Sequence, residues 1–285
     1  MRRWVGIELR SQPPLVPVLG AAFFDRDPQA VAKDLIGKIL RRRFRSRWLS
    51  VQIVEAEAYY LREKGSHASL GRTPSREALF MPAGTIYMYY SRGRDSLNVS
   101  CRGAGNAVLF KAGRPFADAI SPPENIELMH TLNPGSRGER PLERLCSGQT
   151  LLCRALELKL ADWNRRVFDP ESFYVEDTGY RPSRLVQTRR LGIPRGRDEH
   201  LLYRFIDLDF VRSATSNPLT VRAAQAGIDF RILELRPKAV AAGDRFGVRN
   251  SREKAAQLKA YPRGRRRGSK SKGSGALRVN REKLG

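Results

Sequence analysis

The sequence predicts a mixed α/β (α+β) fold with a core of its own. Short strand-like runs recur along most of the chain, and amphipathic helical stretches separate them. A glycine-rich hairpin signal at 103–106 joins two of those runs, which favours antiparallel pairing. The chain has 285 residues, of which 41% are apolar, so it can fill the core of one large domain or two small ones.

The first elements follow from proline positions and apolar spacing. Residues 1–18 are expected to be irregular, because Pro13, Pro14 and Pro17 exclude a regular helix there. Residues 25–39 are predicted to form an amphipathic helix, with Asp25 or Asp27 as N-cap and Pro28 at the first helical position. Its expected apolar face contains Val31, Leu35, Ile36 and Leu40. A strand over 48–57 follows and ends at Glu57.

The later elements are shorter. We expect a short helix over 75–81 and strands over 85–90 and 97–100, with a polar turn at 91–96 between the two strands. The remaining expected elements are strands at 107–112, 172–176, 184–187 and 203–208, and helices at 124–132 and 150–158.

The charge of the chain is strongly positive, at +24 with an isoelectric point near 10.8. A polyanionic partner is the leading explanation for such an excess. Residues 231–285 carry 17 Lys and Arg against 4 Asp and Glu, and 263–275 are low-complexity and almost free of apolar residues. We therefore expect residues 236–285 to be a disordered basic tail, since they cannot bury enough surface to fold.

Cysteine usage and hydropathy limit the class of protein. Cys101, Cys146 and Cys153 have neither a disulfide-scaffold count nor paired zinc spacing, so they are expected to be free thiols in a reducing cytoplasm. The N-terminus lacks a continuous apolar signal region, and no apolar run approaches the length of a membrane span. We expect a cytoplasmic protein, and the sequence signals no metal or cofactor.

One carboxylate, one histidine and several tyrosines lie close together in the sequence. A carboxylate can activate a water, and aromatic faces can hold a flat, electron-poor ring, so the group suggests chemistry on a nucleobase. Glu55 and Glu57 lie two residues apart on one strand face, and chemistry alone does not choose between them. The group also contains His67, Tyr59, Tyr87 and Tyr89. A solvent-facing glutamate, an incidental loop histidine and packing tyrosines are the simpler alternatives.

The order and spacing of these residues resemble those of a known family. The matching text is Phe23-Phe24-Asp25, 35–40, 53–59, Ser66-His67-Ala68, Thr73-Pro74, 81–89, Leu97-Asn98-Val99, 145–148, 152–156 and Asn217-Pro218-Leu219. The chain resembles the alkyladenine (3-methyladenine) DNA glycosylases, the eukaryotic-type family also found in bacteria, over about residues 19–230. The resemblance implies a single domain with a curved, mostly antiparallel sheet flanked by helices, like the formyltransferase C-terminal domain. It places the glycosylase domain at 19–235, before the tail.

The resemblance also assigns roles to individual residues. Glu57 corresponds to the general base that activates water for attack on C1′, which selects it over Glu55. Tyr59, His67 and Tyr89 correspond to the walls around a flipped base, and His67 is also able to donate a hydrogen bond to that base. Asn98 corresponds to the pocket residue that crowds the exocyclic amino group of guanine.

The residues expected to bind DNA or to intercalate are Arg92, Arg94, Lys111 and Tyr87. Lys111 stands where the family usually has an arginine, which keeps the charge and loses the fork of donors. Arg92 stands where the family has an intercalating tyrosine, in a shortened turn, and either inserts into the stack or holds a phosphate. The segment from Tyr59 to His67 is one residue shorter than usual, and the residues after Ser147-Gly148 lack the family's proline and lysine.

The implied function is initiation of base excision repair by a monofunctional, cofactor-free glycosylase. Its expected partner is duplex DNA with damaged purines, and the protein is expected to act as a monomer, nucleoid-associated if bacterial. The first alternative is a non-catalytic nucleic-acid-binding protein on the same scaffold. The second is an RNA- or ribosome-associated factor, which only the basic tail favours. Pocket size decides whether hypoxanthine or etheno-adenine is accepted beside 3-methyladenine.

Overall fold

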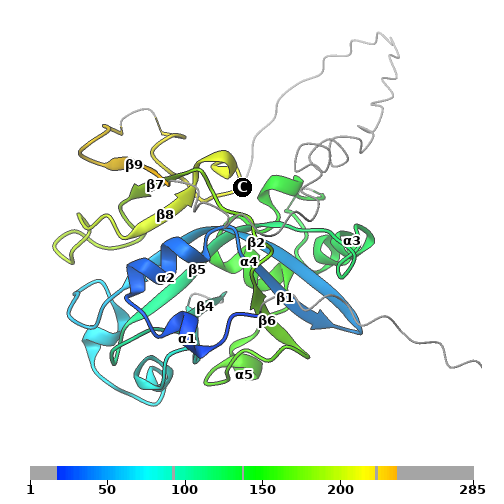
Figure 1. Ribbon diagram of the computed structural model, residues 1–285, viewed down its shortest axis with the longest axis horizontal. Helices are drawn as coiled ribbons and strands as arrows, with labels where there is room; N and C mark the ends of the chain where they lie inside the picture. Colours follow the sequence, from blue (N-terminus) through cyan, green and yellow to red (C-terminus); the bar gives the residue numbers. More distant parts are fainter. Residues whose placement is uncertain (1–17, 92–93, 137, 222–223, 236–285) are drawn as a thin grey trace, which may run out of the picture. The chain divides into compact units, whose positions relative to one another are not determined.

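The computed structural model describes residues 18–91, 94–136, 138–221 and 224–235 (Figure 1). These residues form an α+β arrangement of one large antiparallel sheet and a few short helices, which confirms the predicted fold class.

The long strand β2 (Arg47–Tyr59) organises the sheet. Strand β5 (Ala107–Pro115) pairs along one edge of β2. Two strands share its other edge: β1 (Ile39–Phe44) pairs with the first half, and β8 (Arg204–Asp207) pairs with residues 55–57. The sheet therefore divides into two branches along β2, and the second half of β2 lies between β5 and β8.

The other strands extend the sheet outward from β5, β8 and β1. Strands β4 (Arg94–Ser100) and β3 (Ile86–Ser91) follow β5, strands β7 (Arg184–Thr188) and β9 (Phe230–Glu234) follow β8, and β6 (Phe173–Glu176) pairs with β1. Every pair of named strands is antiparallel.

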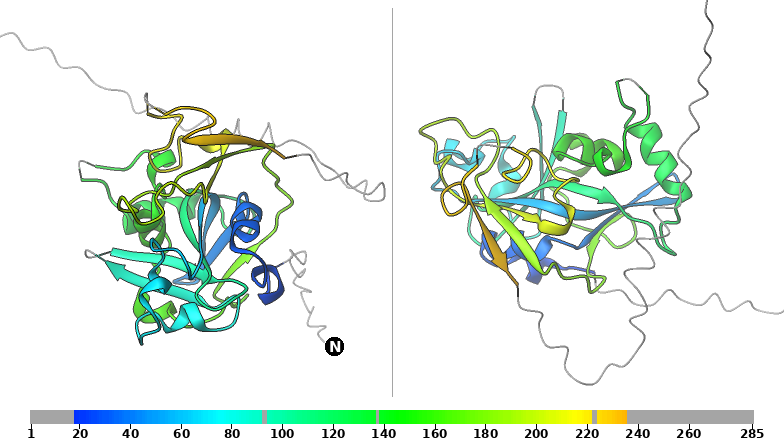
Figure 2. Two further views of the ribbon diagram at one scale, coloured as in Figure 1. Left: turned by 90° about the vertical axis from the view of Figure 1, so that its left-hand side faces the viewer. Right: turned by 90° about the horizontal axis from the view of Figure 1, so that it is seen from above.

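Helices cover both faces of the sheet. Helices α1 (Ala21–Phe24) and α2 (Pro28–Leu35) lie on one face, and α3 (Glu124–Leu132) and α4 (Gln149–Ala155) lie on the other (Figure 2, right). The short helix α5 (Leu160–Trp163) packs against β3. Four 3₁₀ turns complete the described elements, at His67–Leu70, Glu77–Phe80, Leu142–Arg144 and Leu208–Phe210. No helix in these ranges is long and apolar enough to span a bilayer.

The first long helix is shorter than predicted. Asp27 is its N-cap, accepts from the amides of Gln29 and Ala30, and is followed by Pro28 at the first helical position. The helix ends at Leu35, and Gly37 adopts a positive φ of 89°. The apolar residues beyond it, which fitted the helical period, instead form the start of β1, where Ile39 pairs with Gln52 and Leu40 with Val51.

Most predicted strands are present, and the polar turn is the clearest error. The prediction gave 91–96 as a turn, whereas β4 already begins at Arg94. Tyr89 pairs with Ser96 and Tyr90 with Asp95, and the Asp95 carboxylate accepts from the amide of Leu160. Polar residues thus continue the hairpin because their side chains find partners. Strands β1 and β9 had no counterpart among the predictions.

A buried arginine joins the two strands of one branch. Arg41 on β1 is fully buried and donates from Nε to Glu176 on β6 at 2.8 Å and from Nη2 to Asp118 at 2.6 Å. It also donates to the Ser50 hydroxyl at 2.9 Å. A buried cation is tolerated when such hydrogen bonds replace its lost hydration.

Replacing Arg41 is expected to destabilise the domain severely. Arg41→Met leaves Glu176 buried without its cation, which should lower the free energy of unfolding by about 3–5 kcal/mol. Urea unfolding at pH 7 measures the loss. Arg72→Met, which breaks an exposed pair with Glu77, is the matched control and should scarcely move the midpoint. Equal effects of the two substitutions would contradict this account of the network.

Candidate active site

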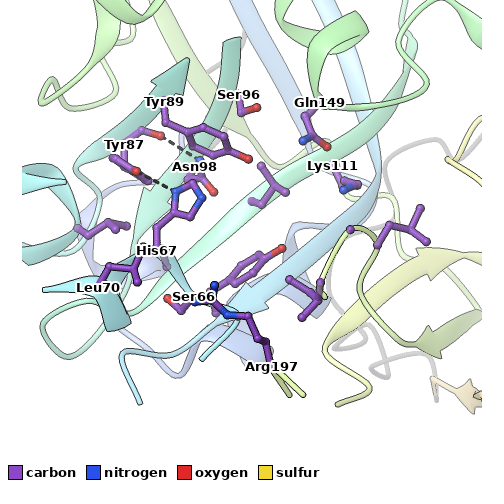
Figure 3. Close-up of a pocket in the computed structure, with 18 of the residues that line it drawn as sticks. Ser66, His67, Leu70, Tyr87, Tyr89, Ser96, Asn98, Lys111, Gln149 and Arg197 are labelled. Carbon is purple, nitrogen blue, oxygen red and sulfur yellow. Dashed lines mark hydrogen bonds between the residues drawn. The ribbon is translucent and has the colours of Figure 1, made fainter. Parts of the chain in front are cut away.

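A cavity of about 730 Å³ opens on the face of the sheet that carries α4 (Figure 3). Its floor comes from strands β2 to β5, and its sides come from the loops 65–70 and 191–197 and from the start of α4. The lining includes Tyr59, Ser66, His67, Leu70, Tyr87, Tyr89, Arg94, Ser96, Asn98, Leu109, Lys111, Gln149, Thr150, Leu191, Ile193 and Arg197.

The two-residue period of the strands explains why these side chains meet. Tyr87 on β3 is paired with Asn98 on β4, and Asn98 is paired with Leu109 on β5. Leu109 is in turn paired with Glu57 on β2. Residues paired across strands project from the same face, so this row and its neighbours two positions along, which include Tyr89 and Lys111, face one region.

Glu57 lies beneath the cavity with no exposed surface. Its Oε2 accepts from the Tyr59 hydroxyl at 2.6 Å, and its Oε1 accepts from the Leu191 amide at 3.3 Å and lies 3.3 Å from Lys111 Nζ. Burial alone would raise the pKa of this carboxyl. The charges of Lys111 and Arg204 and the two hydrogen bonds outweigh burial, so the pKa of Glu57 is lowered below 4.5 and the group is ionised at neutral pH.

Glu55 is equally buried and bound in a different way. Its Oε1 accepts from Arg204 Nε at 2.6 Å and from the Thr215 hydroxyl at 2.7 Å, while its Oε2 accepts from the Thr215 amide at 2.7 Å. Neither Arg204 nor Thr215 lines the cavity, whereas the partners of Glu57 do, namely Tyr59, Lys111 and Leu191. The β2–β5 register shifts on either side of Glu55, and this irregularity separates the surroundings of the two glutamates. The contacts of Glu55 are therefore those of a buried ion pair whose partners lie outside the cavity lining.

The aromatic residues gather on one side of the cavity. The rings of His67 and Tyr89 are 4.5 Å apart at 68°, and those of Tyr87 and Tyr89 are 5.9 Å apart at 33°. Figure 3 shows His67, Tyr87 and Tyr89 together, across the view from Lys111 and Gln149. Tyr87 is buried and lies behind His67, with its hydroxyl 3.1 Å from Nδ1. Asn98 donates to the Tyr87 carbonyl at 3.2 Å and is thereby fixed at the cavity.

The histidine is held in its neutral form. Desolvation against the tyrosines lowers the pKa of His67, and the charges of Arg76 and Arg197 lower it further, below 6.5. When the Tyr87 hydroxyl donates to Nδ1, the ring proton resides on Nε2 and remains available as a donor.

Tyr59 is fixed from behind by a buried arginine. The Arg190 guanidinium lies 4.5 Å from the Tyr59 ring centroid and does not line the cavity, so it occupies the far face of the ring. Arg190 also pairs with buried Glu63 and donates to the Ala58 carbonyl at 2.9 Å. The next residue, Leu191, supplies the amide that binds Glu57. One short segment thus positions both the tyrosine and the carboxylate.

The structure brings most of the sequence-predicted residues to one site. Arg94 and Lys111 line the same cavity as the aromatic residues, whereas Arg92 lies outside the described residues. Sequence reasoning missed Gln149, Arg190, Leu191, Arg197 and Arg204. The basic, glycine-containing run 189–197 could have been noticed, but no pattern in it specifies contact with Glu57. Within the described ranges, no cluster of three His, Cys, Asp or Glu side chains could hold a metal.

Comparison with known proteins agrees with the family resemblance that the sequence motifs indicate. The family model for methylpurine-DNA glycosylase matches residues 22–210. A Pseudomonas aeruginosa (strain LESB58) protein named "Putative 3-methyladenine DNA glycosylase" is 55% identical over 212 residues, which are 74% of this chain and 88% of that protein. Proteins of the same name from Pseudomonas fluorescens (strain Pf0-1) and Koribacter versatilis are 54% and 33% identical, over 80% and 68% of this chain and 99% and 92% of their own lengths. The chain belongs to the methylpurine-DNA glycosylase family.

The environment of His67 predicts its titration. Because partial desolvation and two arginines disfavour the charged ring, its pKa should lie below 6.5, and the charge should appear only as the pH falls through that lowered value. NMR titration of the imidazole signals measures it, and the His67→Gln variant identifies the signal among the three histidines. A pKa at or above 6.5 would contradict the described surroundings.

Proposed function

We propose that this protein removes alkylated purines from duplex DNA by hydrolysing the N-glycosidic bond, without cleaving the strand. Family membership and the names of the relatives support glycosylase chemistry on methylated purines. The observation that carries the proposal for this chain is Glu57, an ionised carboxylate buried beneath an aromatic cavity.

A carboxylate in this place suits the reaction. The departing base leaves an oxocarbenium-like sugar, whose charge an anion stabilises while it also accepts a proton from the attacking water. Tyr59, Lys111 and Leu191, which bind Glu57, all line the cavity. Lys111 has a flexible stem and three donors, so its ammonium can hold the carboxylate and a water together. We therefore assign the approach of water to the Lys111 side of Glu57.

The cavity suits an extruded purine. Its volume of about 730 Å³ lies in the usual range for ligand sites, and Tyr59, His67 and Tyr89 offer ring faces to a stacked base. An alkylated purine such as 3-methyladenine is cationic, so π-faces attract it more strongly than a normal base. A neutral His67 does not repel that charge, and its Nε2–H is able to donate to the base. Asn98, at the floor, would exclude the amino group of guanine.

The partner in this proposal is double-stranded DNA. Arg94 and Arg197 line the cavity, and Arg76 lies close enough to His67 to lower its pKa, so positive charge surrounds the opening where phosphates would lie. Flipping of the damaged nucleotide and release of its base would begin base excision repair, with the protein acting as a monomer.

Removing the carboxylate is the decisive test. Glu57→Gln should reduce base release from methylated duplex DNA by about 10² to 10⁴-fold, because glutamine cannot take the proton from water. Binding to the same DNA should persist. Glu127→Gln, the same change on an exposed face of α3, is the control. If the wild type also bound this DNA without releasing a base, the result would favour the non-catalytic nucleic-acid-binding protein.

Deleting residues 236–285 tests the remaining alternative. Truncation after Leu235 should leave base release intact while weakening DNA binding most at low salt, with a shallower dependence of log K on log salt, because the Lys and Arg side chains of this segment no longer contact phosphates. Release and binding at 50–200 mM salt measure the two effects. Loss of all function on truncation would favour the RNA- or ribosome-associated factor.

A further inference from the structure

Leu70 is an apolar side chain left in solvent at the edge of the base cavity. Of the large apolar residues that the structure describes as exposed, Leu70 and Leu191 line the cavity, and Leu70 is the more exposed, at 57% against 39%. It is the last residue of the 3₁₀ turn His67–Leu70, so a wall of the cavity and this side chain share one turn. Figure 3 shows Leu70 near His67, away from Lys111 and Gln149 in that view.

The backbone that carries Leu70 is fixed. Arg76 donates from Nη2 to the Leu70 carbonyl at 3.2 Å. The turn is capped by the Ser66 hydroxyl, which accepts from the Ala68 amide at 3.3 Å, and it closes with the Gly71 amide on the Ala68 carbonyl at 3.0 Å. These contacts hold the turn in place, so the turn presents Leu70 to solvent beside the cavity.

A second, open depression lies beyond Leu70. It is lined by Leu61, Arg62, Lys64, Ala68, Ser69, Leu70, Gly71 and Arg197, and it shares Leu70 and Arg197 with the base cavity. Arg197 is held there by donating from Nε to the Lys64 carbonyl at 2.8 Å. Arg62 and Lys64 thus line the depression alone, and Leu70 and Arg197 lie where it meets the base cavity.

We propose that Leu70, in place of Arg92, inserts into the gap that the flipped nucleotide leaves in the stack, while Arg62, Lys64 and Arg197 bind the neighbouring phosphates of that strand. This inference rests on the proposed function, since it requires an extruded base in the cavity. The vacated position must face the cavity opening, where Leu70 stands. Apolar side chains such as leucine serve as wedges between base steps, because they displace water from the gap and replace part of the lost stacking contact.

The role predicts a difference between paired and unpaired substrates, because a single strand has no gap to fill. Leu70→Ala should slow single-turnover base release from methylated duplex DNA by about tenfold or more, and should change release from the same strand without its complement by less than about twofold. Leu70→Met, which keeps the apolar length, should restore the duplex rate. Ile228→Ala, which removes an exposed apolar side chain outside the cavity lining, is the matched control.

Two results would overturn the wedge: an unchanged duplex rate in Leu70→Ala, or an equal loss on duplex and single strand, which would indicate a damaged cavity. If the wild type releases no base, the proposed function itself fails. The fluorescence of 2-aminopurine placed beside the lesion then decides: a rise on binding that Leu70→Ala loses supports insertion, and an equal rise with both proteins overturns it.

The phosphate contacts have a separate readout. The double variant Arg62→Gln with Lys64→Gln should reduce the slope of log K against log salt by about 1–2 on duplex DNA, because two cations that contact phosphates are lost. An unchanged slope would remove the basic depression from the proposal.

Discussion

The buried ion pair between Glu55 and Arg204 is the interaction on which the rest of the site depends. Arg204 on β8 reaches Glu55 on β2 and also donates to the Thr215 hydroxyl and the Ser216 carbonyl, at 2.9 and 2.8 Å. It therefore fastens the β8–β7–β9 branch and the 213–217 loop to the central strand. The segment that follows β7 carries Arg190 and Leu191. The position of this branch therefore decides where the Arg190 guanidinium that packs on Tyr59 and the Leu191 amide lie. A displaced branch would remove the support of Glu57 as well.

The same arginine takes part in the charge balance beneath the cavity. Glu55 and Glu57 are two buried negative charges, and Arg204 and Lys111 are two buried positive ones beside them. Charges are tolerated in such a place when they are paired and hydrogen-bonded. Glu55 is saturated by fixed partners, whereas Glu57 is bound by a flexible lysine, a tyrosine hydroxyl and one amide. Two glutamates separated by a single residue thus differ because one is held on all sides and the other is held by groups that face a cavity.

The fold and the site could be predicted where residues follow a local pattern or a family motif, and not where distant contacts decide. The family resemblance predicted that Glu57, Tyr59, Tyr89, Asn98 and Lys111 belong to one site, and the structure shows that they lie on adjacent strands of one sheet. Strand β1 was missed because Ile39 and Leu40 continue the apolar period of the preceding helix, and only pairing with β2 and β6 makes them a strand. Arg190 and Leu191 act through contacts with residues more than a hundred positions away, which no local pattern encodes.

The two sides of the cavity differ in electrostatics, which bears on the charged bases of the proposed function. His67 and Tyr89 form one side, with Tyr87 behind them as an uncharged support. Tyr59 has the Arg190 guanidinium on its far face, and that cation withdraws electron density from the ring that a cationic base would approach. Under the proposed function, attraction of a positive base through π-faces would therefore fall mainly to Tyr89 and His67. Tyr59 would contribute chiefly by position: its hydroxyl donates to Glu57, and its ring, packed against Arg190, would limit where a base can lie.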